Sequence, residues 1–377
     1  MSDYQKVIRG RESLKKLPEL MKKLGVRKPM VVGTDDLAAA LFRYHPTFLS
    51  APFFSVSRPI PDLEDAKTGA GVFRREECDG LISAGGAPSI ETAKAIKAWI
   101  RTGKEEEFIH GRLNSGPSLP HIAVPGTAGT GSEATGFAAV YVNGARVNLN
   151  HTELQPEGVV LDAALNDSFS LYLRKSCALG ILAQGIESYW SRGANEDSKV
   201  HAYLAIIGVL DNLKAYMEED PHAAEEMLDA GFQSGKAARI SGLSAARALS
   251  YTLSERLNIG LGHASMLLLP ALWEMMQDHE EMRETLTELS ARMRLGDMRM
   301  VPKLLKGILY DLDMEVSPLF GGELPEGPEC SADAALLSNH PVSLTKEEIR
   351  KAFRLAMAPV CENEKLACTD IWKYYGR

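Results

Sequence analysis

The chain has 377 residues, of which 45% are hydrophobic and 24% charged, so it is long enough to form two globular domains. Its formal net charge of −8 leaves no basic excess to neutralise phosphate groups, and we expect no nucleic-acid partner. The N-terminus lacks a signal-peptide pattern, no long uncharged apolar run occurs, and the five cysteines form no CxxC pair, so we expect a cytoplasmic protein with reduced thiols and no membrane contact.

Short apolar runs alternate with helical segments in the first half of the chain. Strands are predicted at 29–33, 53–57, 79–84, 121–125 and 159–161, and helices at 12–24, 37–42, 63–78 and 90–100. This alternation predicts a parallel sheet covered by helices. Residues 137–142 and 147–149 are predicted to form a hairpin that turns at Asn143 and Gly144.

After Asp162 helical periodicity dominates. Helices are predicted at 198–217, 223–237, 245–256, 263–280, 282–293, 301–312 and 345–357, and a glycine- and proline-rich surface loop at 318–328. The predicted fold class is therefore an α/β domain over residues 1–165 followed by an all-α domain over residues 166–377. The cleft between two such domains is the default binding site.

A glycine-rich turn at 85–94 follows a predicted strand and opens a predicted helix. Backbone N–H groups at Gly85 and Gly86, together with the helix dipole, can face a pyrophosphate. Ala87 adds a Cβ atom where close approach is needed, and Pro88 removes a donor N–H. The alternative is that Pro88 only occupies the first turn of a helix, which proline tolerates well. Both interpretations stay open.

A second polar loop, 125–135, directly follows the predicted strand 121–125. It contains three glycines together with the hydroxyl groups of Thr127, Thr130 and Ser132. Such a concentration of N–H and hydroxyl donors suits contacts with a phosphate, a ribose or a nicotinamide amide. We therefore expect this loop to bind a ligand.

These stretches carry a family resemblance. GlyThrAlaGlyThrGlySerGluAlaThr at 126–135, the turn at 85–94 and GlnGlyIleGluSerTyrTrpSer at 184–191 resemble the iron-dependent (group III) alcohol dehydrogenases. Within that group the chain is most similar to the phosphonoacetaldehyde reductase branch, on residues 183–191 and on ArgAlaLeuSerTyr at 247–251.

The resemblance covers roughly residues 5 to 360. It implies a Rossmann-like domain followed by a helical domain, a homodimer, and reduction of an aldehyde, held on divalent iron or zinc, by a nicotinamide hydride. It also implies NAD or NADP as the cofactor, with contacts from Gly85, Gly86, Thr127, Thr130 and Ser132.

Carried over residue by residue, the metal site of the family is not retained. The family's aspartate falls on Gly180, and its three histidine ligands fall on Gln184, Arg247 and Leu261; the branch itself has glutamine at the first of these three. A divalent metal needs several carboxylate or imidazole ligands, which this set does not supply. The sequence therefore predicts no bound metal at the degenerate site.

Three residues near the lost metal site are candidates for catalysis. Arg247 restores one positive charge and can bind a phosphonate, phosphate or carboxylate, or polarise a carbonyl; the alternative is an inter-domain salt bridge, for instance with Glu187. Tyr251 lies four residues later on the same helix face and can donate a proton, or it is an ordinary core tyrosine. His263 is a candidate general acid or a structural residue at a helix start. Gln184 is expected to line the substrate site.

Three functions remain open at this point. The first is a metal-independent, NAD(P)H-linked reductase of a small anionic aldehyde or ketone, such as a phosphonate, based on the 125–135 loop, Arg247, Tyr251 and His263. The second is a metal-free lyase or isomerase of a phosphonate-like metabolite, based on the altered glycine turn. The third is a non-catalytic paralogue that binds a metabolite or a partner.

Overall fold

The structure is a computed structural model that describes residues 5–113, 119–315, 333–358 and 362–374. By its internal contacts the chain divides into two compact units. Unit 1 comprises residues 1–169 and 219–235, and unit 2 comprises residues 170–218 and 236–377. The predicted loop at 318–328 lies outside the described residues.

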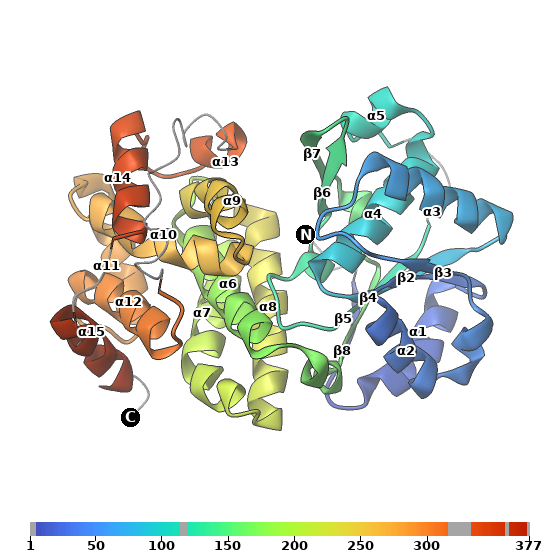
Figure 1. Cartoon of the computed structure of the whole chain (residues 1–377), viewed down its shortest axis with the longest axis horizontal. Helices are drawn as coiled ribbons and strands as arrows, with labels where there is room; N and C mark the ends of the chain where they lie inside the picture. The colour runs from blue at the N-terminus through green and yellow to red at the C-terminus, as the bar shows by residue number, and fades with distance from the viewer. Residues whose placement is uncertain (1–4, 114–118, 316–332, 359–361, 375–377) are drawn as a thin grey trace. The chain divides into compact units, whose positions relative to one another are not determined.

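A six-stranded parallel sheet forms the centre of unit 1 (Figure 1). Its strands are β1 (Lys6–Arg9), β2 (Pro29–Gly33), β3 (Phe53–Ser55), β4 (Gly80–Gly85), β5 (His121–Pro125) and β8 (Gly158–Leu161). They are ordered β1-β8-β5-β4-β2-β3, and every neighbouring pair is parallel. The carboxyl ends of all six strands therefore meet at one edge of the sheet, where open α/β sheets bind their ligands.

Helices cover both faces of this sheet. They are α1 (Leu17–Leu24), α2 (Asp35–Tyr44), α3 (Leu63–Arg75) and α4 (Ala87–Thr102), and the short α5 (Glu105–Ile109) follows. Successive side chains of strand β2 point to opposite faces of the sheet. Val31 belongs to the hydrophobic cluster that includes Leu17 of α1, while Met30 and Val32 belong to the cluster that includes Ile96 of α4. The predicted hairpin forms as β6 (Phe137–Val142) and β7 (Ala145–Asn150).

Unit 2 consists of helices. They are α6 (Leu171–Trp190), α7 (Glu196–Met217), α9 (Ala245–Leu257), α10 (Leu261–Met276), α11 (Arg283–Arg292), α12 (Val301–Asp311), α13 (Ala334–Ser338), α14 (Lys346–Ala356) and α15 (Glu362–Tyr374). Residues 263–273 of α10 are all buried, because this helix packs against α6, α9, α12 and α14. The predicted fold class, a parallel-sheet domain followed by a helical domain, is confirmed.

Helix α8 (Pro221–Ser241) belongs to both units. The sequence predicts one domain boundary near residue 165, whereas by its contacts the segment 219–235 is grouped with the sheet. Periodicity within a helix cannot show which neighbours the helix packs against, so this grouping has no sequence signal.

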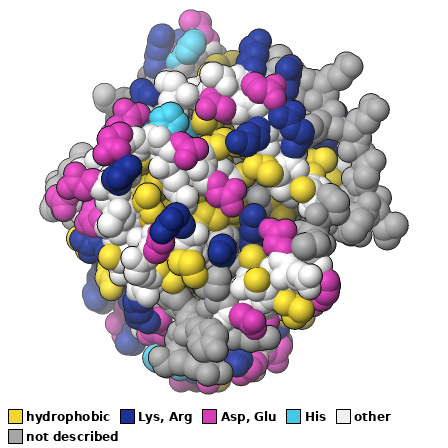
Figure 2. Space-filling view, turned by 90° about the vertical axis from the view of Figure 1, so that its left-hand side faces the viewer, with side chains coloured by type: hydrophobic (Ala, Val, Ile, Leu, Met, Phe, Trp, Pro, Cys, Tyr) yellow, Lys and Arg dark blue, Asp and Glu magenta, His cyan; other side chains and the backbone are white. Residues whose placement is uncertain are grey.

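Among the described residues, no helix combines the length and apolar character needed to cross a membrane. Figure 2 shows one face of the molecule, on which basic and acidic side chains are interspersed and hydrophobic side chains lie between them. The expectations about nucleic acid, membranes and a partner subunit stay predictions.

Candidate functional site

The two predicted cofactor segments lie side by side in unit 1. Gly85 at the end of β4 is in register with Pro125 at the end of β5, and the Gly126 N–H donates to the Gly85 carbonyl oxygen at 3.0 Å. Gly86 precedes the first residue of α4, and a methyl group on it would lie 3.4 Å from Thr127 Oγ1. Gly86 and Thr127, both partly exposed, therefore lie side by side at the start of α4, where a phosphate-binding turn is found, whereas the predicted contact Gly85 is buried at the end of β4.

Two glycines of the 125–135 loop pack against helix α8. Gly131 has a φ angle of +71°, and a methyl group there would meet the Gly231 carbonyl oxygen and the backbone of Gly235. A methyl group on Gly231 would in turn meet the Gly129 carbonyl oxygen. These glycines permit close contact between a loop and a helix, which explains part of the loop composition without a ligand.

The buried side chain of Lys94 holds the far end of this loop. Its Nζ donates to the Ser132 carbonyl oxygen at 2.6 Å and to the Phe137 carbonyl oxygen at 2.8 Å, and it lies 3.4 Å from Ser132 Oγ. Ser132 is 8% exposed. Of the predicted cofactor contacts, Ser132 therefore faces a protein group, while Thr127 and Thr130 are partly exposed.

Burial changes the acidity of two groups beneath the loop. Desolvation lowers the pKa of Lys94 to about 8, against the opposing effects of the Glu91 and Glu133 carboxylates. Desolvation also raises the pKa of Glu133 to about 7. Burial thus shifts the pKa of both groups toward neutral pH.

In unit 2, one face of α6 carries Gly180 and Gln184, two positions that the family resemblance aligns with metal ligands. Tyr172, Ser176, Gly180 and Gln184 follow one another at intervals of four and so share a helix face. Gly180 permits the start of α10 to approach, since a methyl group on Gly262 would lie 2.8 Å from its Cα atom. Gly180, which the resemblance aligns with the family's aspartate, therefore lies where α6 and α10 contact each other.

Arg247, near the start of α9, contacts two residues of α6. Its Nη2 donates to Gln184 Oε1 at 3.1 Å, and its backbone N–H donates to Glu187 Oε2 at 3.1 Å. Glu187 also accepts from the backbone N–H of Ser244 at 3.2 Å and from its hydroxyl at 2.8 Å. The alternative of an inter-domain salt bridge between Arg247 and Glu187 is therefore wrong: both residues lie in unit 2, and the carboxylate caps the first turn of α9.

The guanidinium of Arg247 retains donors for a ligand. Within the described parts of the chain Gln184 Oε1 is its hydrogen-bond acceptor, and the residue is partly exposed. A guanidinium has several further N–H donors in a planar fork. The burial of Glu187 raises the pKa of its carboxyl group, while the positive charge of Arg247 acts in the opposite direction.

His263 lies in a polar cluster at the start of α10. Its Nε2 contacts the Met314 carbonyl oxygen, which can only accept, so Nε2 carries the proton and Nδ1 faces the Tyr172 hydroxyl at 3.4 Å. The His263 N–H donates to Ser176 Oγ at 3.3 Å, and the Gly260 N–H donates to the Tyr172 hydroxyl at 2.8 Å. Burial lowers the pKa of His263, which is 6% exposed. A proton from His263 would have to pass through Tyr172, which is 43% exposed.

The residues that the resemblance aligns with the family's metal ligands do not fit a divalent metal. Leu261 has no donor atom, Gly180 contacts a neighbouring helix, and Gln184 already accepts a hydrogen bond from a cation. In the described residues, no group of three or more His, Cys, Asp or Glu side chains could hold a metal ion. Tyr251 is partly exposed one helical turn after Arg247.

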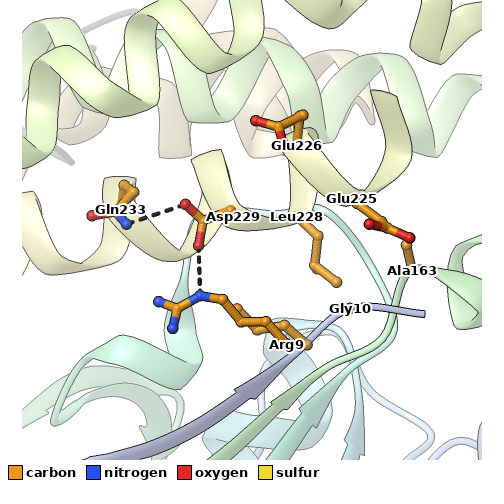
Figure 3. A pocket seen from close by; sticks show the side chains of 9 residues that line it. Arg9, Gly10, Ala163, Glu225, Glu226, Leu228, Asp229 and Gln233 are labelled. Carbon is orange, nitrogen blue, oxygen red and sulfur yellow. Dashed lines mark hydrogen bonds and ion pairs between the residues drawn. The ribbon is translucent and has the colours of Figure 1, made fainter. Parts of the chain in front are cut away.

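A cavity of about 370 Å³ in unit 1 involves none of the predicted site residues (Figure 3). It is lined by Arg9, Gly10, Leu161, Ala163, Glu225, Glu226, Leu228, Asp229 and Gln233. Arg9 Nε donates to Asp229 Oδ1 at 2.9 Å, so the one cation of the lining is already paired with a carboxylate. The remaining charges are acidic, and an anionic metabolite is not favoured there.

Comparison with known families identifies the class of protein. Residues 5–163 match the family described as iron-containing alcohol dehydrogenase, and residues 176–357 match the C-terminal domain of the Fe-containing alcohol dehydrogenase family. The chain belongs to this family.

The chain is also similar to individual proteins of known name. The chain is 31% identical over 220 residues to the probable alcohol dehydrogenase EutG of Escherichia coli, covering 57% of this chain and 55% of that protein. It is 28% identical over 256 residues to the NAD-dependent methanol dehydrogenase of Bacillus methanolicus, covering 64% of this chain and 66% of that protein. The matched segment thus spans about half the length of the E. coli relative.

Solved structures share the fold. Sulfoacetaldehyde reductase from Bifidobacterium kashiwanohense in complex with NAD+ superposes with a TM-score of 0.84 at 20% identity, covering 95% of this chain and 98% of that one. The iron-containing alcohol dehydrogenase of Thermococcus thioreducens gives 0.81 at 22% identity, covering 95% and 99%. At these identities the likeness establishes architecture only.

Sequence reasoning did not find three residues that organise the site. Lys94 reaches the 125–135 loop across a separation of 38 residues, and Ser244 reaches Glu187 across 57. Tyr172 contacts Gly260 across 88 residues. Only the position of Lys94 at the end of the glycine-rich turn offers a sequence signal, and a lysine there is equally consistent with an exposed helix residue.

Proposed function

We propose that this chain is a metal-independent, NAD(P)H-linked reductase of a small anionic aldehyde or ketone, of the phosphonate type. The observation that carries the proposal is the Arg247 guanidinium, bonded to Gln184 while Glu187 caps the helix beneath it. A positive charge with further N–H donors thus lies at a position that the family resemblance aligns with a metal ligand, which supports the proposal. Gln184 and Arg247 are the proposed substrate contacts.

The proposed reaction transfers a hydride from the nicotinamide to the carbonyl carbon and a proton to the carbonyl oxygen, giving an alcohol. Arg247 binds the anionic group of the substrate or stabilises the negative charge that develops on the oxygen. Tyr251, one turn along α9 and partly exposed, is the proposed proton donor. His263 acts only through Tyr172, since its ring is buried.

The proposed cofactor surface consists of Gly85, Gly86 and Thr127, with Thr130 as a further contact. A relative that is 28% identical is an NAD-dependent dehydrogenase, which supports a nicotinamide cofactor for this chain. The choice between NAD and NADP is an outcome of the experiment below. We further propose a homodimer, from the family resemblance, and a cytoplasmic location, from the scattered cysteines.

The first experiment measures binding by melting temperature and fluorescence. Purified protein, treated with chelator and assayed for metal content, is titrated with NADH, NADPH and a small phosphonate. We expect saturable binding of one dinucleotide and of the phosphonate, and turnover of a phosphonate aldehyde without added metal. No dinucleotide binding at millimolar concentration would contradict the proposal.

The second experiment tests Arg247. Arg247→Ala is expected to weaken phosphonate binding about a hundredfold, because a charged hydrogen-bonding partner is lost. Arg256→Ala, an exposed arginine on the same helix, is the matched control and is expected to leave binding unchanged. Equal affinities of the two variants would contradict the role given to Arg247.

A second candidate function involves no hydride transfer. The chain would then be either a metal-free lyase or isomerase of a phosphonate-like metabolite, or a non-catalytic paralogue that binds a metabolite or a partner. The observation that favours it is the use of Gly129 and Gly131 in helix packing, which removes two of the residues that suggested a cofactor loop. Phosphonate binding without dinucleotide binding would support this candidate.

A further inference from the structure

Lys94 is a fully buried cation in unit 1 whose surroundings are unusual. It lies on α4, two helical turns after Gly86, and is 0% exposed. Its Nζ reaches oxygen atoms of three residues that follow β5: Ser132, Thr135 and Phe137, at 2.6, 3.2 and 2.8 Å for the nearest atom of each. An ammonium group has three N–H donors, and here each has an acceptor.

The acceptors of Lys94 are neutral. Two are backbone carbonyl oxygens and one is a threonine hydroxyl, while the carboxylates of Glu91 and Glu133 act on the ammonium only through space. Glu91 is engaged elsewhere, accepting the Ala139 N–H at 3.0 Å. A buried charge that is costly to desolvate is thus used to fix backbone carbonyls.

The neighbouring lysine on the same helix shows the contrast. Lys97, 2% exposed, forms an ion pair with Glu157 at 2.8 Å. Glu157 in turn accepts the backbone N–H of His121 in β5 at 2.7 Å. Lys97 therefore stabilises the sheet, whereas Lys94 fixes the loop that faces Gly86.

We propose that Lys94 is a positioning residue for the dinucleotide: its ammonium group fixes residues 132–137 and so holds the 125–135 loop, with Thr127, in the conformation that faces Gly86. This inference rests on the proposed cofactor site. It differs from a purely structural role because it concerns the affinity for the cofactor, which depends on a preformed loop.

The experiment compares Lys94→Met with Lys97→Met in the full chain, with NADH as the probe. Both substitutions remove a buried ammonium from α4, so both are expected to lower the melting temperature. We expect Lys94→Met to raise the Kd for NADH about tenfold or more, as loss of charged hydrogen bonds would, and Lys97→Met to leave it within about twofold. Equal effects of the two variants on Kd would overturn the inference.

Thr135→Val provides a milder test should Lys94→Met fail to fold. It removes the hydroxyl that accepts from Lys94 at 3.2 Å and keeps the shape of the side chain. We expect a smaller rise in Kd, of about threefold to tenfold, with a melting temperature close to that of the unmodified chain. An unchanged Kd for a folded Thr135→Val variant would also overturn the inference.

The pH profile of binding separates a positioning role from a structural one. The groups that act on Lys94 are Glu91, Glu133 and Lys97, and burial lowers its pKa to about 8. NADH affinity of the unmodified chain should therefore fall as the pH rises through 8, and Lys97→Met should keep this fall. Folded Lys94→Met should bind weakly at all pH values; if it retains the fall, the inference is wrong. If the unmodified chain binds no NADH, the proposed function fails first, independently of Lys94.

Discussion

Arg247 makes two kinds of contact, one through its backbone and one through its side chain. Its backbone N–H is part of the cap of α9, and its guanidinium donates to the side chain of Gln184. Lysine can supply the charge but not the planar fork. We expect Arg247→Lys to weaken binding of a phosphonate about tenfold, less than Arg247→Ala, as measured by calorimetric titration. Affinity equal to that of the unmodified chain would show that a point charge suffices.

Glu187 is predicted to be a stability residue. Its carboxylate accepts the Ser244 hydroxyl at 2.8 Å and backbone N–H groups at the start of α9, and it is 1% exposed. We expect Glu187→Gln to lower the free energy of unfolding in urea by about 2 kcal/mol, because a charged acceptor is lost. Glu255→Gln, at an exposed position of the same helix, should change it by less than about 0.5 kcal/mol. A stable Glu187→Gln variant would argue against the capping role.

We expect His340 to make the stability of the protein depend on pH. Burial lowers its pKa to about 4 from 6.5, assisted by the positive charge of Arg192. Between these values the folded state holds a neutral His340 while the unfolded state binds a proton, so stability rises with pH across this range. The contribution is of the order of 3 kcal/mol. In urea titrations His340→Phe should show a reduced rise between pH 4 and 6.5, and His222→Gln, at an exposed position of α8, should not.

At the scale of elements, the contact between the 125–135 loop and α8 is sensitive to added volume. A methyl group on Gly235 would meet the backbone of Gly131, which cannot move as a flexible side chain would. We expect Gly235→Ala to destabilise the protein by about 1–3 kcal/mol through overpacking.

Gly71→Ala is the matched control for Gly235→Ala. Gly71 lies in α3 and has open space around its Cβ position, so alanine there should stabilise the protein by roughly 0.5–1 kcal/mol through helix propensity. The change in the free energy of unfolding of each variant is to be measured by thermal or urea unfolding. Opposite signs are the expected result, and stabilisation by both substitutions would contradict the packing seen between loop and helix.

The elements themselves could largely be predicted from the sequence, because strand and helix alternate with distinct periodicity. Strand β1 (Lys6–Arg9) was not predicted, since four residues at a sheet edge, with exposed ends, give no clear apolar run. Helix α6 was not delimited, because residues 178–190 are buried all round and show no amphipathic face.

Less of the candidate site could be predicted. The resemblance predicts that Gln184 and Arg247 lie near each other. It does not show whether the Arg247 guanidinium bonds to Gln184 or to Glu187, because that depends on how α9 packs against α6. The position of Lys94 beneath Ser132 depends on tertiary contact alone. Whether His263 is accessible depends on Met314 and Tyr172, which are far from it in the sequence.

At the scale of the whole molecule, metal independence can be tested directly. A bound divalent metal would raise the melting temperature by linkage, so its removal would lower it by several degrees. We expect EDTA treatment to change the melting temperature by less than about 1 °C and to leave NADH-linked turnover unchanged. Activity that is lost with chelator and restored by iron or zinc would contradict metal independence.

The grouping of residues 219–235 with the sheet has a consequence for biosynthesis. Strand β1 can pair only after β8 has been synthesised, because Lys6 pairs with Gly158 of that strand. The glycines of the 125–135 loop likewise pack against Gly231 and Gly235, which are synthesised later. Residues 162–220, which include α6 and α7, emerge from the ribosome between the last strand and the helix that completes unit 1. We therefore expect the N-terminal unit not to complete its folding before α8 is synthesised, and we expect a nascent chain ending at residue 169 to leave the backbone of Gly129 and Gly131 accessible to chaperones and proteases.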